Sequence, residues 1–69
     1  MNTRYSEIVE TLSRAIGNTL DRYEDQGSSI VLHIRWPLTQ PEKTAVKTIA
    51  QTILPGCRLT FQRWSVTIM

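Results

Sequence analysis

Apolar residues in the first third of the chain recur at the spacing of one helix face. From Arg4 onward they follow one another at intervals of four, four, four and three residues, at Ile8, Leu12, Ile16, Leu20 and Tyr23. This spacing predicts an amphipathic helix over residues 4–25. Gly17 weakens that helix, because glycine costs about 1 kcal/mol relative to alanine in a helix interior. The polar run 25–29 then ends it, with Gly27 as a left-handed cap.

The segment Ser29–Trp36 changes to a period of two. Apolar side chains occupy one parity, at Ile30, Leu32, Ile34 and Trp36, while His33 and Arg35 fall on the other. This alternation predicts a strand with one buried face, ended by Pro37.

A second helix is predicted from Thr39 to Leu54. Thr39 and Glu42 have the spacing of a capping box, in which each side chain binds the other residue's backbone N–H. Apolar residues continue from there at helical spacing, and Pro55–Gly56 ends the helix.

The last segment, residues 57–69, reverses its apolar parity half-way. Cys57, Leu59 and Phe61 share one face of a strand, whereas Trp64, Val66 and Ile68 share the other. Either a bulge at Gln62–Arg63 within one long strand or a hairpin turning there restores one apolar face. We favour the long bulged strand, because Gln-Arg is poor chemistry for a two-residue turn.

These elements predict one α+β domain over residues 1–69, with the order α-β-α-β(β). Two amphipathic helices would pack on one face of a small sheet. A single crossover through the second helix would make Ser29–Trp36 and the last segment parallel neighbours.

The size of the chain favours completion of this fold by a second copy. A domain of 69 residues is marginally stable, and its single cysteine excludes an internal disulfide and a multi-cysteine zinc site, while His33 is the only histidine. A straight helix over residues 4–25 would be about 33 Å long, longer than the roughly 28 Å diameter of so small a domain. We therefore expect a homodimer, with no metal and no cofactor.

Charge divides the chain into two halves. Residues 1–28 carry three cations against five acids, a net charge of −2, and residues 29–69 carry five cations against one acid, a net charge of +4. The candidate binding surface consists of His33, Arg35, Lys43, Lys47, Arg58 and Arg63. The candidate acidic contact consists of Asp21, Glu24 and Asp25. Both tryptophans have apolar parity and are expected in the core.

No motif for catalysis, phosphate binding or metal binding occurs in the chain. Cys57 and His33 could form a thiol–imidazole pair, but a cysteine at the start of an apolar strand is typical of a core residue. We expect a non-enzymatic adaptor or regulator that binds another protein, with nucleic-acid binding by the basic half as the alternative. No apolar run reaches the roughly 18 residues of a membrane span, and acids occupy the N-terminal region, so a cytoplasmic location is expected.

Overall fold

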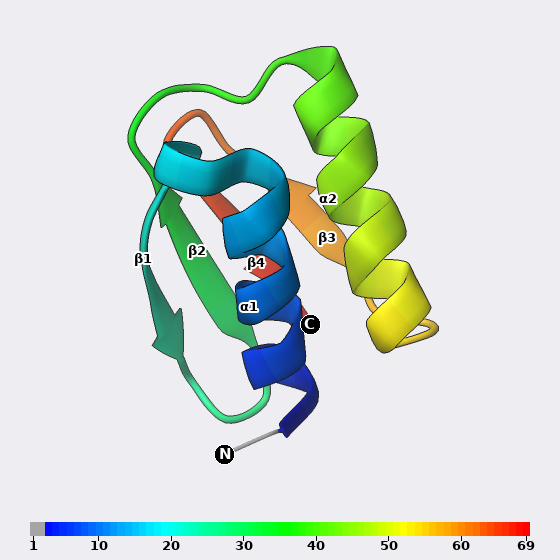
Figure 1. The fold of residues 1–69 in the computed structure, drawn as a ribbon. Helices are drawn as coiled ribbons and strands as arrows, with labels where there is room; N and C mark the ends of the chain where they lie inside the picture. Colours follow the sequence, from blue (N-terminus) through cyan, green and yellow to red (C-terminus); the bar gives the residue numbers. More distant parts are fainter. Residues whose placement is uncertain (1–2) are drawn as a thin grey trace.

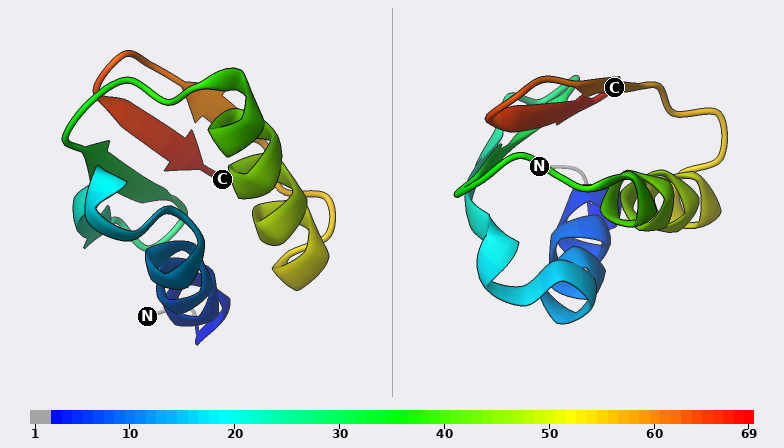
Figure 2. Two further views of the ribbon diagram at one scale, coloured as in Figure 1. Left: turned by 45° about the horizontal axis from the view of Figure 1, so that its top comes forward. Right: turned by 90° about the horizontal axis from the view of Figure 1, so that it is seen from above.

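The structure, a computed structural model, describes residues 3–69 and contains two layers within them. Helix α1 (Thr3–Ile16) and a 3-10 turn η1 (Gly17–Thr19) lead into strands β1 (Leu20–Asp25) and β2 (Ile30–Ile34). Helix α2 (Gln40–Ile53) then precedes strands β3 (Leu59–Phe61) and β4 (Ser65–Ile68). The strands form one antiparallel sheet in the order β1-β2-β4-β3, with both helices on one face (Figures 1 and 2). The α+β class and the placement of both helices on one side are thus confirmed.

The first helix is shorter than its apolar pattern predicts. It ends at Ile16, Gly17 takes the left-handed value φ = +53°, and Leu20–Asp25 pairs with β2 instead of continuing the helix. Leu20 and Tyr23 are three residues apart, which suits a helix face, but a bulge between Leu20 and Arg22 also puts both on one face of a strand. At about 1.5 Å per residue, 14 residues span about 21 Å. The helix therefore fits within the 26 Å length of the molecule. Its length thus no longer supports a homodimer.

Strands β1 and β2 form a hairpin through the polar run that follows Asp25. The Asp25 carboxylate (Oδ1) accepts a hydrogen bond of 2.8 Å from the N–H of Gly27, which has φ = +85°. The Gln26 N–H donates to the Ser29 carbonyl at 2.8 Å. Gly27 is thus a turn residue and not the helix cap that the sequence predicted.

The C-terminal segment is also a hairpin, so the predicted long bulged strand is wrong. Leu59 lies opposite Ile68 and Phe61 opposite Val66, whereas a two-residue turn at Gln62–Arg63 would have placed Leu59 opposite Val66. The Gln62 N–H donates to the Ser65 carbonyl at 2.8 Å, and the turn residues Arg63 and Trp64 keep negative φ. Residues with negative φ can form this turn, so the absence of glycine or asparagine at Gln62–Arg63 does not exclude a hairpin.

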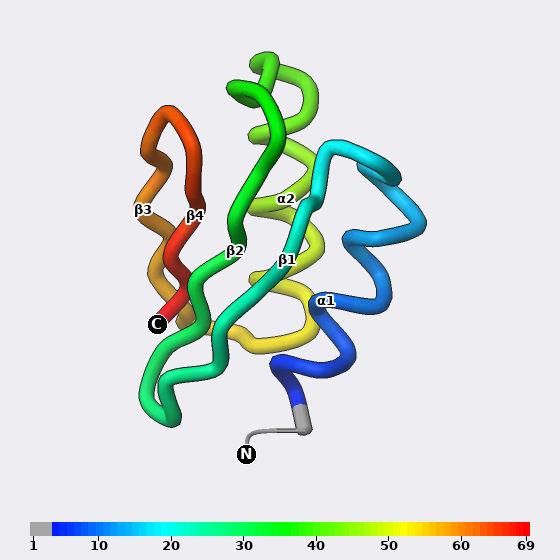
Figure 3. Tube along the Cα trace, turned by 90° about the vertical axis from the view of Figure 1, so that its left-hand side faces the viewer, coloured from blue at the N-terminus to red at the C-terminus, as the bar shows by residue number. Residues whose placement is uncertain are grey.

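The hairpin also changes the direction of the neighbour of β2. Strand β4 pairs with β2 in antiparallel register, from Ile30 opposite Ile68 to His33 opposite Ser65. The predicted parallel pair is wrong, because the chain turns back once more after β3 before it reaches β2. Figure 3 shows β4 between β2 and β3 along the sheet.

Helix α2 and strand β2 follow the predicted patterns. The Glu42 N–H donates to the Thr39 hydroxyl at 3.4 Å and the Thr39 N–H donates to the Glu42 carboxylate at 2.9 Å, so the capping box is confirmed. In β2 the residues Ile30, Leu32 and Ile34 are buried and alternate with half-buried ones. The core between the layers consists of Tyr5, Ile8, Leu12, Ile30, Leu32, Ile34, Leu38, Val46, Ala50, Cys57, Val66 and Ile68.

Both tryptophans are exposed, contrary to their predicted place in the core. Trp36 is 49% exposed because β2 ends at Ile34, so the alternation that buries Ile34 does not reach it. Trp64 is 54% exposed because it lies in the turn between β3 and β4.

Candidate functional site: a basic groove beside strand β3

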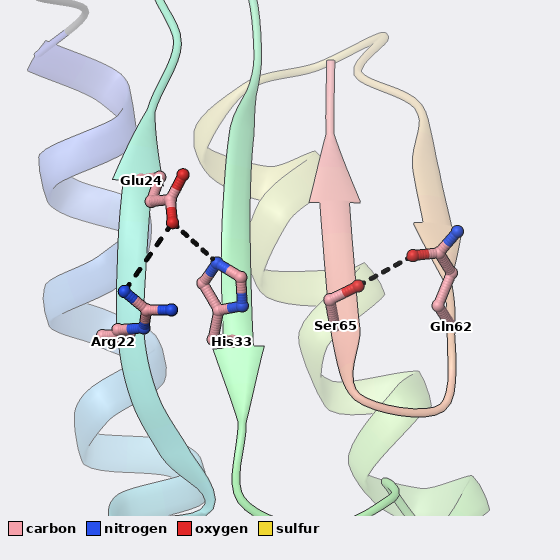
Figure 4. A network of polar contacts seen from close by, with 5 residues as sticks. All are labelled: Arg22, Glu24, His33, Gln62 and Ser65. Atoms are coloured by element: carbon pink, nitrogen blue, oxygen red, sulfur yellow. Dashed lines mark hydrogen bonds and ion pairs between the residues drawn. The ribbon is translucent and has the colours of Figure 1, made fainter.

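The predicted basic surface divides into two parts in the structure. His33 and Arg35 lie with the acids of β1: the Nε2 atom of His33 is 3.1 Å from a carboxylate oxygen of Glu24, and Arg35 Nη2 is 3.3 Å from Asp21. Arg22 also approaches Glu24, at 3.8 Å, on the sheet face turned away from the helices (Figure 4). The contacts of His33 with Glu24 and of Arg35 with Asp21 each join a residue of the candidate binding surface to a residue of the candidate acidic contact. Exposed pairs of this kind contribute about 1 kcal/mol or less.

The other four candidates come together on the opposite edge of the sheet. Three adjoining recesses lie beside α2 and β3, and Phe61 lines all three. Lys43 and Arg63 line one end, Lys43 and Lys47 the middle, and Lys47 and Arg58 the other end. We call these five residues (Lys43, Lys47, Arg58, Phe61 and Arg63) the basic groove.

No acidic residue among those that the structure describes lines this groove. Its other lining residues are polar or apolar: Pro37, Leu38, Gln40, Thr44, Thr48, Gln51, Cys57, Leu59 and Gln62. The acid of α2, Glu42, is held elsewhere by Thr39 and by the Thr19 hydroxyl at 3.3 Å. The backbone N–H of Thr39 is the main reason why the pKa of Glu42 is lowered. Within residues 3–69 the lining of the groove thus carries four cationic side chains and no acidic one.

Strand β3 is an edge strand, and some of its backbone groups have no strand beside them. Arg58 and Met69 exchange two backbone hydrogen bonds, at 2.8 and 2.9 Å, and Gln62 bonds to Ser65. In an antiparallel ladder every second residue bonds to the same neighbour. The N–H and C=O groups of Leu59 and Phe61 therefore point away from β4, toward the open edge.

Exposed aromatic side chains lie at one end of the groove. The guanidinium carbon of Arg63 is 5.9 Å from the centre of the Trp64 ring, within the range of a cation–π contact. The Ile34 N–H donates to the Trp64 carbonyl at 3.1 Å, so the turn lies beside the end of β2, two residues before Trp36. The half-buried Phe61 was not predicted as part of this site, and both tryptophans were predicted in the core although they are exposed. The hairpin that the sequence left open for residues 57–69 was the signal for this site, because a hairpin makes residues 59–61 an edge strand.

The remaining reactive side chains lie apart from one another. Cys57 is buried in the core as predicted, 7% exposed, and burial raises the pKa of its thiol. His33 bonds to Glu24 on the far face of the sheet, so the thiol–imidazole pair considered for these residues does not form. Residues 3–69 contain no cluster of three or more histidine, cysteine, aspartate or glutamate side chains that could hold a metal ion. Neither helix in this range has the length and apolar character to cross a bilayer.

Comparisons with known proteins found no match, so a function can be argued only from this geometry. No protein-family model, no curated protein and no solved structure matches the chain.

Proposed function

We propose that this protein is a non-enzymatic adaptor that binds an extended, acidic segment of another protein in the basic groove. The segment would add to the sheet as a strand beside β3, a recurrent mode of peptide recognition. One observation carries the proposal: four cations line a groove beside an open strand edge, and none of the described residues that line this groove is acidic.

Each part of the groove has a role in this mode of binding. Leu59 and Phe61 offer backbone donors and acceptors to the added strand, and each hydrogen bond contributes about 1 kcal/mol net. Because side chains alternate along a strand, every second residue of the bound segment would face α2. Acidic residues at those positions would approach Lys43 and Lys47, which line the same recess as Phe61.

The short edge limits the strength of this contact. Strand β3 has three residues, and charges near a surface are screened within about 8 Å at physiological ionic strength. We therefore expect a reversible complex whose affinity falls with salt. The homodimer expected from the sequence is one way of occupying the groove, with a second copy as the partner.

A second candidate is binding of single-stranded nucleic acid. The observation that favours it is the pair of exposed tryptophans at the Arg63 end, because bases stack on aromatic side chains beside a basic track. Four cations would give a slope of log K against log salt of about −3, at about −0.7 per phosphate.

Fluorescence anisotropy with labelled probes tests the two candidates. The first probe is a ten-residue peptide that alternates glutamate with valine, the second has lysine in place of glutamate, and the third is oligo-dT. We expect saturable binding of the glutamate peptide alone. Lys43→Glu/Lys47→Glu should abolish it, whereas Arg14→Glu/Arg22→Glu, which changes the net charge equally on other surfaces, should bind at least ten times more tightly than that variant.

Two results would contradict the proposed adaptor role. Absence of glutamate-peptide binding at low salt would remove it. Binding of oligo-dT with a slope near −3, lost in Lys43→Glu/Lys47→Glu, would assign the groove to nucleic acid instead.

A further inference from the structure

The opposite edge of the sheet has a form that matches the basic groove. Strand β1 is also an edge strand, and a recess beside it is lined by Val9 and Ser13 of α1 and by Leu20–Tyr23. Strand β1 carries three acids and one arginine, a net charge of −2, and one of these acids, Asp21, is also paired with Arg35 at 3.3 Å. The groove beside β3 carries four cations, so the two free edges of one sheet have opposite charge.

The backbone register of the two edges is also compatible. Gln26 bonds to Ser29 across the first hairpin, and alternation then directs Glu24 toward β2, with Tyr23 and Asp25 directed outward. Tyr23 lies opposite the buried Leu32, so it belongs to the sheet face that the helices cover. Leu59 and Phe61, the outward residues of β3, lie opposite the buried Ile68 and Val66 and belong to the same face.

This match of parity allows one antiparallel pairing that extends the sheet without turning it over. Tyr23 of one copy would lie opposite Phe61 of another, and Asp25 opposite Leu59, with each pair exchanging backbone hydrogen bonds. Both helix layers would then lie on the same side of a continuous sheet. Tyr23 is 42% exposed in the single chain, and this pairing would bring its ring against Phe61 beside α2.

From this charge and register we infer that the partner segment of the basic groove is strand β1 of a second copy of this chain. The inference rests on the proposed strand-binding role of the groove and names its occupant. Because β1 of one copy meets β3 of the next, the contact is heterologous and leaves a free edge at each end. The assembly is therefore an open head-to-tail chain and not a closed dimer.

Variants in which one edge strand can no longer pair with a further strand test this geometry. Tyr23→Pro and Phe61→Pro each remove an outward N–H without removing a bond of the existing sheet. By sedimentation velocity, the wild-type protein should grow from the 7.9 kDa monomer to several multiples of it between about 1 μM and about 1 mM, less so in high salt. Each variant alone should stay monomeric. Their equimolar mixture should form a 1:1 complex that grows no further, since only one complementary pair of edges remains.

Charge variants provide the test if a proline variant loses its circular dichroism spectrum. Glu24→Lys and Arg58→Glu, whose positions would be diagonal neighbours in this pairing, should each assemble at least ten times more weakly than wild type, and their mixture should associate again. Glu7→Lys, on the exposed face of α1, is the matched control and should assemble as wild type does.

Three results would overturn the inference. A monomeric wild-type protein at every concentration removes it, and so does a single proline variant that dimerises alone, because that requires like edges to pair. A mixture that stays monomeric while the folded Tyr23→Pro variant still binds the glutamate peptide refutes self-docking and leaves the proposed function standing.

Discussion

Gly17 follows the last residue of α1 and has left-handed backbone angles, and its replacement by alanine tests whether this conformation helps to end the helix. Gly17 has φ = +53°, and a Cβ added there would meet no heavy atom within 4 Å. Steric contact therefore contributes nothing to the effect of Gly17→Ala. What remains is the strain of a left-handed alanine, about 1–2 kcal/mol.

One opposing effect must be subtracted. Alanine reduces the conformational entropy of the unfolded chain and so stabilises the folded state by about 0.4–1 kcal/mol. The expected net result is a loss of about 0.5–1 kcal/mol in the free energy of unfolding. Asn tolerates the left-handed region better than alanine does, so Gly17→Asn should lose less.

Urea denaturation followed by circular dichroism at 222 nm measures this difference. With an m-value of about 1 kcal/mol/M for so small a domain, the midpoint should fall by about 0.5–1 M. Gly27→Ala is the matched control, because its added Cβ also meets no atom within 4 Å and its φ is +85°. A Gly17→Ala variant more stable than wild type, with increased helical signal, would refute the reasoning, because it would mean that the helix continues toward Tyr23.

Three further predictions concern the N-cap residue Thr39, the pH dependence that Glu42 contributes, and the thiol of Cys57. Thr39→Ala removes the hydroxyl that accepts from Glu42 N–H and should lower the free energy of unfolding by about 1 kcal/mol in the same urea assay. The pKa of Glu42 is lowered in the folded state, mainly by the Thr39 N–H. Its stabilising contribution is therefore present above the ordinary value of 4.5 and lost as pH falls through the lower folded pKa. The melting temperature of Glu42→Gln should accordingly fall less than that of wild type between pH 6 and pH 3. Burial raises the pKa of Cys57, so a thiol reagent at pH 8 should label it at least ten times more slowly than the urea-unfolded chain; equal rates would contradict its burial.

The elements that the sequence predicts well are those with one period and local stop signals. Strand β2 alternates without interruption and is followed by Pro37, and α2 begins at a capping box. Leu20 and Tyr23, in contrast, satisfy both a helix and a bulged strand, and the choice depends on pairing with β2 across the hairpin. The turn at Arg63 and Trp64 is also decided by distant partners, since β4 inserts between β2 and β3.

The same distinction explains which part of the candidate site could be predicted. Lys43 and Lys47 are four residues apart on a correctly predicted helix, so their common face follows from the sequence alone. Arg58 and Arg63 join them only because the last segment folds into a hairpin. The pairing of His33 with Glu24 could not be predicted, because the sequence analysis placed Glu24 on a helix and the structure places it on the strand beside His33.

The fold itself makes charge the feature that distinguishes the two edges. A helix followed by a hairpin occurs twice, as α1-β1-β2 and α2-β3-β4, and the inner strands β2 and β4 of the two units pair in the middle of the sheet. Each unit therefore places its first strand at a free edge with a recess beside its helix. Backbone geometry alone would let like edges pair as readily as unlike ones. The difference between −2 on β1 and four cations in the basic groove disfavours like pairs, because equal charges repel, and it directs the β3 edge toward an acidic strand.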